Sequence, residues 1–442
     1  MNNREGILKP FEQNKDFMEE RILHGIENNR KGFFKIHLQD DSGKTIEKAH
    51  IKIKLKKHEF KYGANLFMLE EFAEPEQNQA YKEYFADTFN HATLPFYWCD
   101  LEPEEGKPRY DKNSPKVYRR PAPDLCLEFC EANGIEPKAH CLNYAGFSPA
   151  WALGDLAKEK RLFEKHCQEL AERYSSRIPD WEVTNETYWG TFSLPNYSSL
   201  YASDDFVEWC FDTAERYFHA NRLLINEATH HIFGNSKGFR NDYYLQVDRA
   251  LKNGARIDSI GMQYHMFHCK EEESQKTEFY YNPKWLYYTL DCFAKLGKPM
   301  QITEVTIPAY STEAADEEIQ AEIIRNLYRI WFSHPAMEAI VYWNLIDGYT
   351  AFASQGNMSA GENYYYGGLL RQDFTPKPAY YVVRDLFKKE WHTELDCNTE
   401  NGEFEFKGFY GDYELEISTG EKTVIRNISL KKRDFLNFKV TL

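Results

Sequence analysis

Two glutamates of this sequence, Glu186 and Glu304, each end a short segment with the length and composition of a β-strand. Glu186 closes the segment "DWEVTNE", with Asn185 beside it, and Glu304 closes "PMQITE". Two carboxyl groups that face each other can divide the roles of proton donor and nucleophile, as hydrolysis of a glycosidic bond requires. Their separation sets the stereochemical outcome, with about 5 Å for retention and roughly 6.5–9.5 Å for inversion. The alternative, that each is a cap or a surface residue, is less favoured for two residues in equivalent positions than for one.

The segments that must position these residues alternate along the chain between about residues 60 and 390. Eight apolar, strand-like segments occur there, separated by amphipathic stretches of helical period. The eight segments are "FKYGANLF", "NHATLPFYW", "IEPKAHCLNY", "DWEVTNE", "RLLINEA", "IDSIGMQYH", "PMQITEV" and "AIVYWNLID". Eight repeats of strand and helix predict the α/β class and a closed (β/α)8 TIM barrel.

Polar side chains stand near the ends of several of these strands. They are His91, His140, Asn185, Glu186, Asn226, Glu227, Gln263, Tyr264, His265, Glu304 and Asp347. The carboxyl ends of barrel strands converge on one face, so we expect these side chains to meet in a single cleft.

Both ends of the chain carry alternating apolar and polar residues, a pattern typical of half-buried strands. The N-terminal part contains "GFFKIHLQD" and "KAHIKIKLKKHEFKYG", and the C-terminal part contains "GEFEFKGFYGDYELEIST", "KTVIRNISL" and "FLNFKVTL". Neither set can bury a core alone, so we expect both to form one small accessory β-sandwich-like module. The expected organisation is an N-terminal segment at 1–58, a barrel at 59–390 and C-terminal strands at 391–442.

Composition argues against several classes of partner. The chain carries 54 basic and 69 acidic residues, a net charge of -15, whereas nucleic acids and anionic membranes bind basic surfaces. No segment approaches the roughly 18 apolar residues of a membrane span, and the start "MNNREGILKPFEQNK" lacks the apolar core of a secretory signal. The nine scattered cysteines contain no CxxC and are typical of reduced thiols. We therefore expect a cytoplasmic protein without a nucleic-acid or membrane partner; the sequence does not indicate its oligomeric state.

Six segments resemble motifs of the glycoside hydrolase family 10 xylanases, in the family's order, over about residues 60 to 390. "DWEVTNE" resembles W-D-V-V-N-E, which ends in the acid/base, and "QITEVTI" resembles I-T-E-L-D-I, which contains the nucleophile. "GMQYH" matches G-x-Q-x-H, "AHCLNYAGFSPAW" resembles H-T-L-V-W-H-x-Q-x-P-x-W, and "YWNLID" resembles W-G-V-x-D. "GGLLRQDFTPKPAY" resembles the family's closing L-x-x-x-x-x-P-K-P-A-Y.

The resemblance implies a role for each matching residue. Glu186 becomes the acid/base and Glu304 the nucleophile, with His265 bonded to the nucleophile and Trp343 under the sugar at the cleavage site. The supporting and substrate-binding residues are Asn185, His140, Gln263, His265 and Trp343, together with Tyr144, which stands where the family has a tryptophan. No cofactor is required, and the partner is a β-linked polysaccharide or oligosaccharide.

The segments that shape the sugar pocket depart from the family. The family's T-x-E-N-x-M-K-W, whose Glu, Asn and Lys hold sugars on the non-reducing side, is replaced here by "TLPFYW". Tyr144, Ala145 and Phe147 replace the family's Trp, His and Gln. The first interpretation is a retaining β-glycoside hydrolase that cuts β-1,4-xylan or xylo-oligosaccharides internally. Two alternatives stay open: an exo-acting or oligosaccharide-specific β-glycosidase for a different sugar, and a carbohydrate-binding barrel with impaired catalysis.

Two further groups of residues are weaker candidates. In "DKNSPKVYRRPAPD", residues 111–124, Tyr118, Arg119 and Arg120 are placed to meet a charged branch such as a uronate, because arginine binds carboxylates in a bidentate way. The alternative is a solvated loop with ordinary surface arginines. "QYHMFHC" offers His268 and Cys269 beside His265, but a structural zinc site takes four ligands, so we expect no metal.

Overall fold

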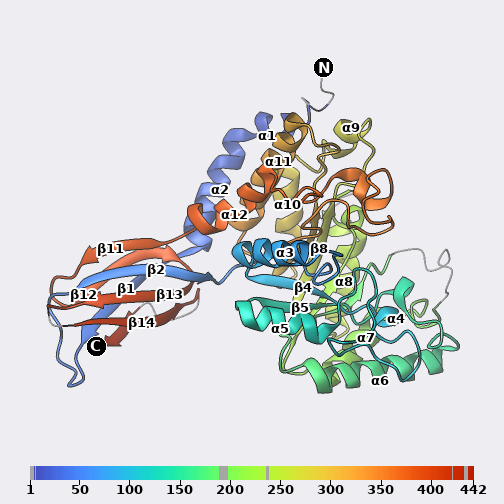
Figure 1. Cartoon of the computed structure of the whole chain (residues 1–442), viewed down its shortest axis with the longest axis horizontal. Coiled ribbons are helices and arrows are strands. Elements are labelled where there is room, and N and C mark those ends of the chain that lie inside the picture. The colour runs from blue at the N-terminus through green and yellow to red at the C-terminus, as the bar shows by residue number, and fades with distance from the viewer. Residues whose placement is uncertain (1–3, 5, 189–197, 235–237, 421, 433–436) are drawn as a thin grey trace.

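The computed structural model of the chain has two parts that lie side by side, a large α/β part and a small β part (Figure 1). It describes all residues except 1–3, 5, 189–197, 235–237, 421 and 433–436. Buried apolar side chains of both parts join in one hydrophobic core. At the junction, for example, the rings of Phe332 and Phe409 lie 6.2 Å apart.

The large part is built on eight strands that are parallel to one another. They are β3 (Lys61–Asn65), β4 (His91–Pro95), β5 (Glu136–His140), β6 (Asp180–Asn185), β7 (Arg222–Asn226), β8 (Ser259–His265), β9 (Met300–Thr306) and β10 (Met337–Tyr342). They close into a barrel in the order β10-β3-β4-β5-β6-β7-β8-β9. Nearly all of their residues are buried, because helices cover the outside and side chains fill the inside. The predicted (β/α)8 barrel is therefore confirmed.

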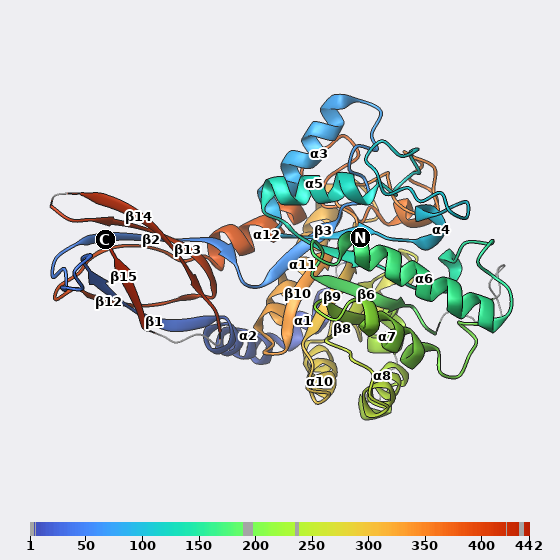
Figure 2. The ribbon, with the colours of Figure 1, turned by 90° about the horizontal axis from the view of Figure 1, so that it is seen from below.

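Helices between the strands cover the outside of the barrel (Figure 2). They are α3 (Pro75–Thr88), α4 (Trp98–Leu101), α5 (Pro123–Asn133), α6 (Leu156–Tyr174), α7 (Phe206–Tyr217), α8 (Asp242–Lys252), α9 (Glu273–Thr277), α10 (Pro283–Ala294), α11 (Ala314–Ser333) and α12 (Pro378–Asp385), with the short turns η1 (Ala145–Phe147), η2 (His230–Gly234), η3 (Gly238–Arg240), η4 (Gly361–Tyr365) and η5 (Leu386–Glu390). In α5, Pro123 occupies the first turn and Gly134 ends the helix with a left-handed φ of 64°, as proline and glycine commonly do. Among the described residues, no helix has the length and apolar character needed to cross a membrane.

The N-terminal residues form two helices that the sequence patterns do not predict, α1 (Lys9–Gln13) and α2 (Lys15–Asn29). In α2 only Met18, Ile22 and Gly25 are buried, too few for a helical period to stand out. The helix packs against α11 of the barrel, where Glu19 forms an ion pair with Arg329 at 2.6 Å.

The small part is an accessory module of two sheets built from both ends of the chain (Figure 2). Its strands are β1 (Lys31–Gln39), β2 (His50–His58), β11 (Glu394–Asn398), β12 (Glu403–Phe409), β13 (Gly411–Ser418), β14 (Thr423–Leu430) and β15 (Asn437–Thr441). One sheet has the order β12-β1-β15 and the other β11-β2-β13-β14. The sheets contact each other, for example where the rings of Phe406 and Tyr413 lie 5.8 Å apart. The prediction that strands from both ends of the chain form one accessory module is confirmed; β11 is an additional strand.

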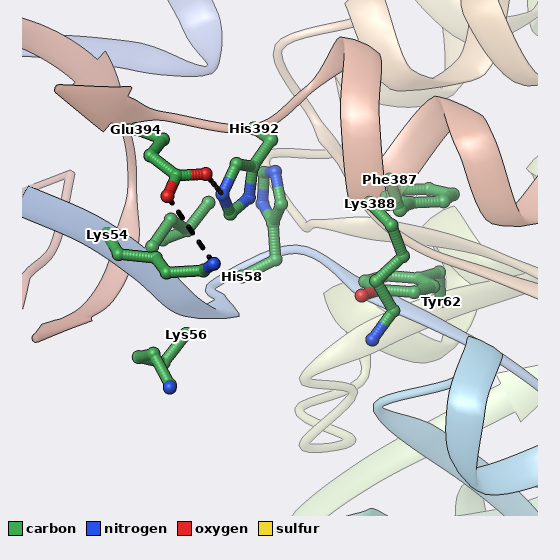
Figure 3. A pocket seen from close by; sticks show the side chains of 9 residues that line it. Lys54, Lys56, His58, Tyr62, Phe387, Lys388, His392 and Glu394 are labelled. Atoms are coloured by element: carbon green, nitrogen blue, oxygen red, sulfur yellow. Dashed lines mark hydrogen bonds and ion pairs between the residues drawn. The ribbon is translucent and has the colours of Figure 1, made fainter.

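A hollow of about 270 Å³ lies where the module meets the barrel (Figure 3). Lys54, Lys388 and Tyr62 are among its lining residues. Glu394 lies 3.4 Å from Lys54 and 3.8 Å from His392, so its charge is balanced within the hollow. Because Tyr62 stands near the start of β3, the hollow is at the opposite end of the barrel from the carboxyl ends of the strands.

Three short connections join the module to the rest of the chain: between α2 and β1, between β2 and β3, and between η5 and β11. We propose that the two domains meet at these connections, close to residues 30, 59 and 391, and that α1 and α2 belong with the barrel, against which α2 packs.

Candidate active site

Glu186 and Glu304 lie close together at the carboxyl ends of the barrel strands. Glu186 directly follows β6, and Glu304 lies in β9. The side-chain amide of Gln263, from β8, donates to both, because its Nε2 lies 2.9 Å from Oε1 of Glu186 and 3.2 Å from Oε1 of Glu304. One amide nitrogen thus bridges two carboxyl groups that are far apart in the sequence.

The backbone of Glu186 has a conformation that residues other than glycine rarely take. Its φ is 50°, in the left-handed region. The N–H of Glu186 donates to the carbonyl of Asn226 at 3.2 Å, and the hydroxyl of Tyr201 donates to the carbonyl of Glu186. These two bonds hold the strained residue, and with it the direction of its carboxyl group.

Burial raises the pKa of Glu186, and the nearby charge of Glu304 raises it further. The hydroxyl of Tyr144 lies 2.6 Å from Oε2 of Glu186. This bond and the bond from Gln263 act in the opposite direction, because they stabilise the charged form. The net rise favours the protonated form that a general acid needs.

Both carboxylate oxygens of Glu304 accept hydrogen bonds. Nε2 of His265 lies 3.1 Å from Oε2, and Nδ2 of Asn226 lies 3.0 Å from Oε1. The other ring nitrogen of His265 lies 2.9 Å from the hydroxyl of Thr306, so the ring is fixed at both ends. Glu304 is only 3% exposed and is held in one orientation.

Asn185 also lies at the site, but its amide oxygen is already engaged. The oxygen accepts from Nδ2 of Asn226 at 2.8 Å, and the side chain is buried. Within the described structure Asn185 therefore supports Asn226, which in turn bonds Glu304.

His140, from β5, lies in a buried polar network beside Trp343. Its Nδ1 lies 2.5 Å from Glu182 and its Nε2 lies 3.0 Å from the hydroxyl of Tyr97. Burial opposes ionisation of Glu182, but Lys138 and His140 outweigh it and lower its pKa to about 2. The ring of His140 is thus fixed with its centroid 5.5 Å from that of Trp343.

Three of the polar residues that we expected at the strand ends do not join the site. Tyr264 points outward from β8, where its hydroxyl donates to the carbonyl of Tyr280 at 2.5 Å and its ring lies 4.9 Å from that of Trp331 in α11. His91 is the first residue of β4 rather than one of its last, so it lies at the other end of the barrel. Asp347 lies beyond β10, where it accepts from the N–H of Gly368 at 2.7 Å and pairs with Lys377 at 2.6 Å. Asp347 therefore stabilises the loop between β10 and α12 and does not face the cleft.

The arginines of residues 111–124 are engaged within the protein, and the alternative of ordinary surface arginines is wrong. Arg119 is 3% exposed and donates to Oδ1 of Asn344 at 3.0 Å. Arg120 pairs with Asp100 at 2.8 Å, and its guanidinium carbon lies 3.8 Å from the centroid of the Tyr97 ring. Residues from distant loops supply these partners, which the local sequence does not reveal.

Asn226, which we expected in the cleft without a stated role, and Thr306, which we did not expect there, both support the carboxyl pair. Asn226 bonds both Asn185 and Glu304, and it pairs with Asn185 in the strand register. Thr306 follows Glu304 by two positions and so shares its face of β9. The sequence held a signal for each residue: Asn226 ends the strand next to that of Asn185, and Thr306 lies two positions after Glu304 on the same strand.

The candidate metal ligands do not converge. Both ring nitrogens of His265 are bonded to Glu304 and Thr306, and Cys269 is exposed. Within the described parts of the chain, no three side chains of His, Cys, Asp or Glu form a group that can hold a metal ion.

A closed parallel barrel with two bridged carboxyl groups at the strand ends has the architecture and the residue set of a barrel-type glycoside hydrolase. The sequence model of the family described as Glycosyl hydrolase family 10 matches residues 55–386. The chain belongs to this family.

Known proteins resemble the chain at low identity. It is 24% identical over 410 residues to the Anti-sigma-I factor RsgI6 of Acetivibrio thermocellus, which covers 90% of this chain and 46% of that protein. It is also 24% identical to Endo-1,4-beta-xylanase 2 of Arabidopsis thaliana, covering 80% of this chain and 30% of that one. The chain thus spans less than half the length of these two relatives. The structure of xylanase 10B from Thermotoga petrophila RKU-1 in complex with xylobiose is similar with a TM-score of 0.59 and 21% identity, covering 75% of this chain and 95% of that chain, so the two share a fold.

Proposed function

We propose that the protein is a retaining β-glycoside hydrolase that acts on β-1,4-xylan or xylo-oligosaccharides. The observation that supports the mechanism most directly is the amide of Gln263, which contacts Glu186 at 2.9 Å and Glu304 at 3.2 Å. Because both Oε1 atoms bond the same nitrogen, the distance between them is less than the roughly 6.5 Å at which the carboxyl spacing of inverting enzymes begins. The pair therefore has the close spacing that suits retention.

In the first step of this mechanism, the carboxylate of Glu304 attacks the anomeric carbon while Glu186 gives its proton to the glycosidic oxygen. The bond to the leaving sugar breaks, and a glycosyl ester of Glu304 forms with inverted configuration. In the second step, the ionised Glu186 takes a proton from water, whose oxygen attacks the same carbon and releases Glu304. Two inversions give net retention.

The choice of xylan rests on the family and on its named members. The Arabidopsis thaliana relative is named an endo-1,4-beta-xylanase, and the Thermotoga petrophila protein is a xylanase in complex with xylobiose. We expect xylo-oligosaccharides to be hydrolysed faster than glucan, mannan or galactan oligosaccharides of equal length. Faster hydrolysis of another β-linked sugar would contradict the proposed substrate but would leave the proposed mechanism unchanged.

The stereochemistry of the first product tests the retaining mechanism. Proton NMR during hydrolysis of an aryl β-xyloside or aryl β-xylobioside is expected to show the β-anomer first, before mutarotation. An α-anomer as the first product would mean inversion and would overturn the proposal.

Substitution of each carboxylate tests its role. Glu304→Ala should reduce turnover to background. Glu186→Ala should reduce hydrolysis by about 10²–10⁴-fold, but added azide should restore turnover of an activated aryl substrate and give a β-glycosyl azide, because azide needs no general base. Glu416→Ala, which removes a half-exposed carboxylate of the module, is the matched control and should keep full activity.

The same assays test the non-catalytic alternative. A protein that binds xylo-oligosaccharides but turns over none of the oligosaccharides or aryl glycosides would be a carbohydrate-binding barrel. The paired carboxyl groups bridged by Gln263 favour catalysis over binding alone.

A further inference from the structure

Glu186 and Glu304 divide the ring of barrel strands into two unequal sides. Glu186 follows β6 and Glu304 lies in β9. Around the closed barrel, β7 and β8 lie between them on one side, and β10, β3, β4 and β5 on the other. A glycan whose reacting bond lies between the two carboxyl groups must extend its sugars toward these two sides. An enzyme that cuts inside a long chain needs room on both.

Aromatic side chains fill the side of the four strands, and we term this cluster the aromatic wall: Phe67, Tyr97, Tyr144 and Phe147. Phe67 follows β3, Tyr97 follows β4, and the other two follow β5. Ring centroids lie 5.9 Å apart for Phe67 and Tyr97, 4.5 Å for Tyr97 and Phe147, and 4.8 Å for Tyr144 and Phe147. Phe67 and Tyr97 are 0% and 5% exposed, so other groups already occupy the space in front of their rings.

The aromatic wall begins at the reacting groups themselves. The hydroxyl of Tyr144 lies 2.6 Å from Glu186. At the other end of the wall, the ring centroid of Phe67 lies 5.2 Å from that of Trp343. The wall therefore stands beside the reacting bond and not several sugars away from it.

Arg120 covers the aromatic wall and holds it in place. Its guanidinium carbon lies 3.8 Å from the ring centroid of Tyr97 and 5.7 Å from that of Phe147, within the range of cation–π attraction. Its Nε pairs with Asp100 at 2.8 Å. Moving the wall aside would break both interactions, so a sugar does not simply displace it.

The side of β7 and β8 carries aromatic rings that reach the surface. His230 is exposed, and Tyr188 and Phe267 are partly exposed, as Tyr144 and Phe147 are at the outer part of the aromatic wall. The ring of Phe267 stacks on that of His265, with centroids 4.7 Å apart and planes 8° from parallel. A flat aromatic surface of this kind can carry sugar rings.

We infer that the site takes the end of a glycan chain, with no more than one or two sugar units on the side of the aromatic wall. The rest of the chain extends over β7 and β8. The inference rests on the proposed glycosidase activity and narrows its substrate class to chain ends and short oligosaccharides. It replaces internal cleavage, our first interpretation of the sequence, by stepwise release of mono- or disaccharides.

Early products of the wild-type protein on xylohexaose test the inference. We expect cuts that release xylose or xylobiose to exceed the central cut to two xylotrioses by about tenfold or more, a preference of the size that pocket shape can give. With soluble xylan, viscosity should fall slowly relative to the formation of reducing ends. Xylotriose as the main early product, or rapid loss of viscosity, would overturn the inference while supporting the proposed function. No hydrolysis of any xylo-oligosaccharide or aryl xyloside would overturn both.

Variants that open the aromatic wall provide a second test. Phe147→Ala and Arg120→Met should each raise the share of central cuts severalfold, and Phe147→Leu, which disturbs packing less, should raise it in the same direction. The readout is a ratio of products, which a general loss of folded protein does not change. Phe33→Ala, which removes an exposed ring from β1 of the accessory module, is the control. Wall variants with the product ratio of the wild type would count against the inference.

Discussion

The phenolic hydroxyl of Tyr144 lies 2.6 Å from Oε2 of Glu186. Tyr144 belongs to the loop that follows β5, whereas Glu186 directly follows β6, so two neighbouring units of the barrel meet at this bond. A hydroxyl that donates to a carboxylate stabilises the charged form and lowers the pKa of the acid. This bond therefore works against burial, which raises the pKa of Glu186.

The first prediction concerns Tyr144→Phe, which keeps the ring and removes the hydroxyl. Without this donor the charged form of Glu186 is less stable, so its pKa rises further and the acid keeps its proton to higher pH. The alkaline limb of the profile of kcat/KM against pH, which reports loss of this proton, should therefore move to higher pH. An unmoved limb, or a shift to lower pH, would contradict the role of the bond. Tyr188→Phe is the control, because the Tyr188 hydroxyl bonds the carbonyl of Asp242.

Glu227 is a second buried acid near Glu186. The hydroxyl of Thr187 lies 2.8 Å from its Oε2, and the N–H of Ala228 donates to its Oε1 at 2.8 Å. These bonds favour the charged form, but burial opposes it. Burial raises the pKa of Glu227 to about 8.

The second prediction is that Glu227→Gln changes how stability depends on pH. Between about 4.5 and 8, the ordinary and the raised pKa, folded Glu227 holds a proton that the unfolded chain has lost. The wild type therefore loses stability as pH rises through this window, by about 1.4 kcal/mol for each pH unit. Glutamine does not titrate, so the free energy of unfolding of the variant, relative to that of the wild type, should rise by about 1.4 kcal/mol for each pH unit in this window. Urea unfolding at several pH values measures the difference; parallel curves for the two proteins would rule out the raised pKa.

The barrel and the main residues of the site were accessible from the sequence because each depends on a short-range pattern. Eight apolar segments separated by amphipathic helices leave few folds other than a closed barrel. In such a barrel the strand ends converge, so Glu186, Gln263, His265 and Glu304 had to lie together whatever their spacing in the sequence. No loop conformation enters this argument.

The contacts that shape the cleft depend on loops and were not predictable. The buried guanidinium of Arg119 bonds Asn344, which lies far along the chain in the loop after β10. The position of Arg120 depends on Asp100 and Tyr97. Such partners come from segments whose paths the local pattern does not determine.

The third prediction concerns the buried pair of Lys138 and Glu182, whose side chains are both 0% exposed. Lys138→Met keeps the length of the side chain but leaves the charge of Glu182 with His140 as its remaining ionisable partner. We expect a loss of about 3–5 kcal/mol in the free energy of unfolding, because a buried charge without its partner is costly. Urea unfolding measures the loss.

The double variant Lys138→Met, Glu182→Gln is the control for this pair. It removes both charges and should recover part of the loss, since the unpaired charge is then gone. A loss below about 1 kcal/mol in the single variant, typical of an exposed pair, would show that the pair contributes little.

The last prediction tests how α2 packs on the barrel. At Gly25, in the middle of α2, an added Cβ would lie 2.4 Å from the carbonyl oxygen of Ser333 in α11. Alanine favours a helix over glycine by about 1 kcal/mol, but overpacking of this kind costs about 1–3 kcal/mol. Gly25→Ala should therefore lower the free energy of unfolding despite the better helix former, because the rigid backbone of α11 cannot yield. Gly420→Ala, where nothing lies within 4 Å, is the matched control; a Gly25→Ala protein at least as stable as the wild type would mean that the two helices are not in close contact.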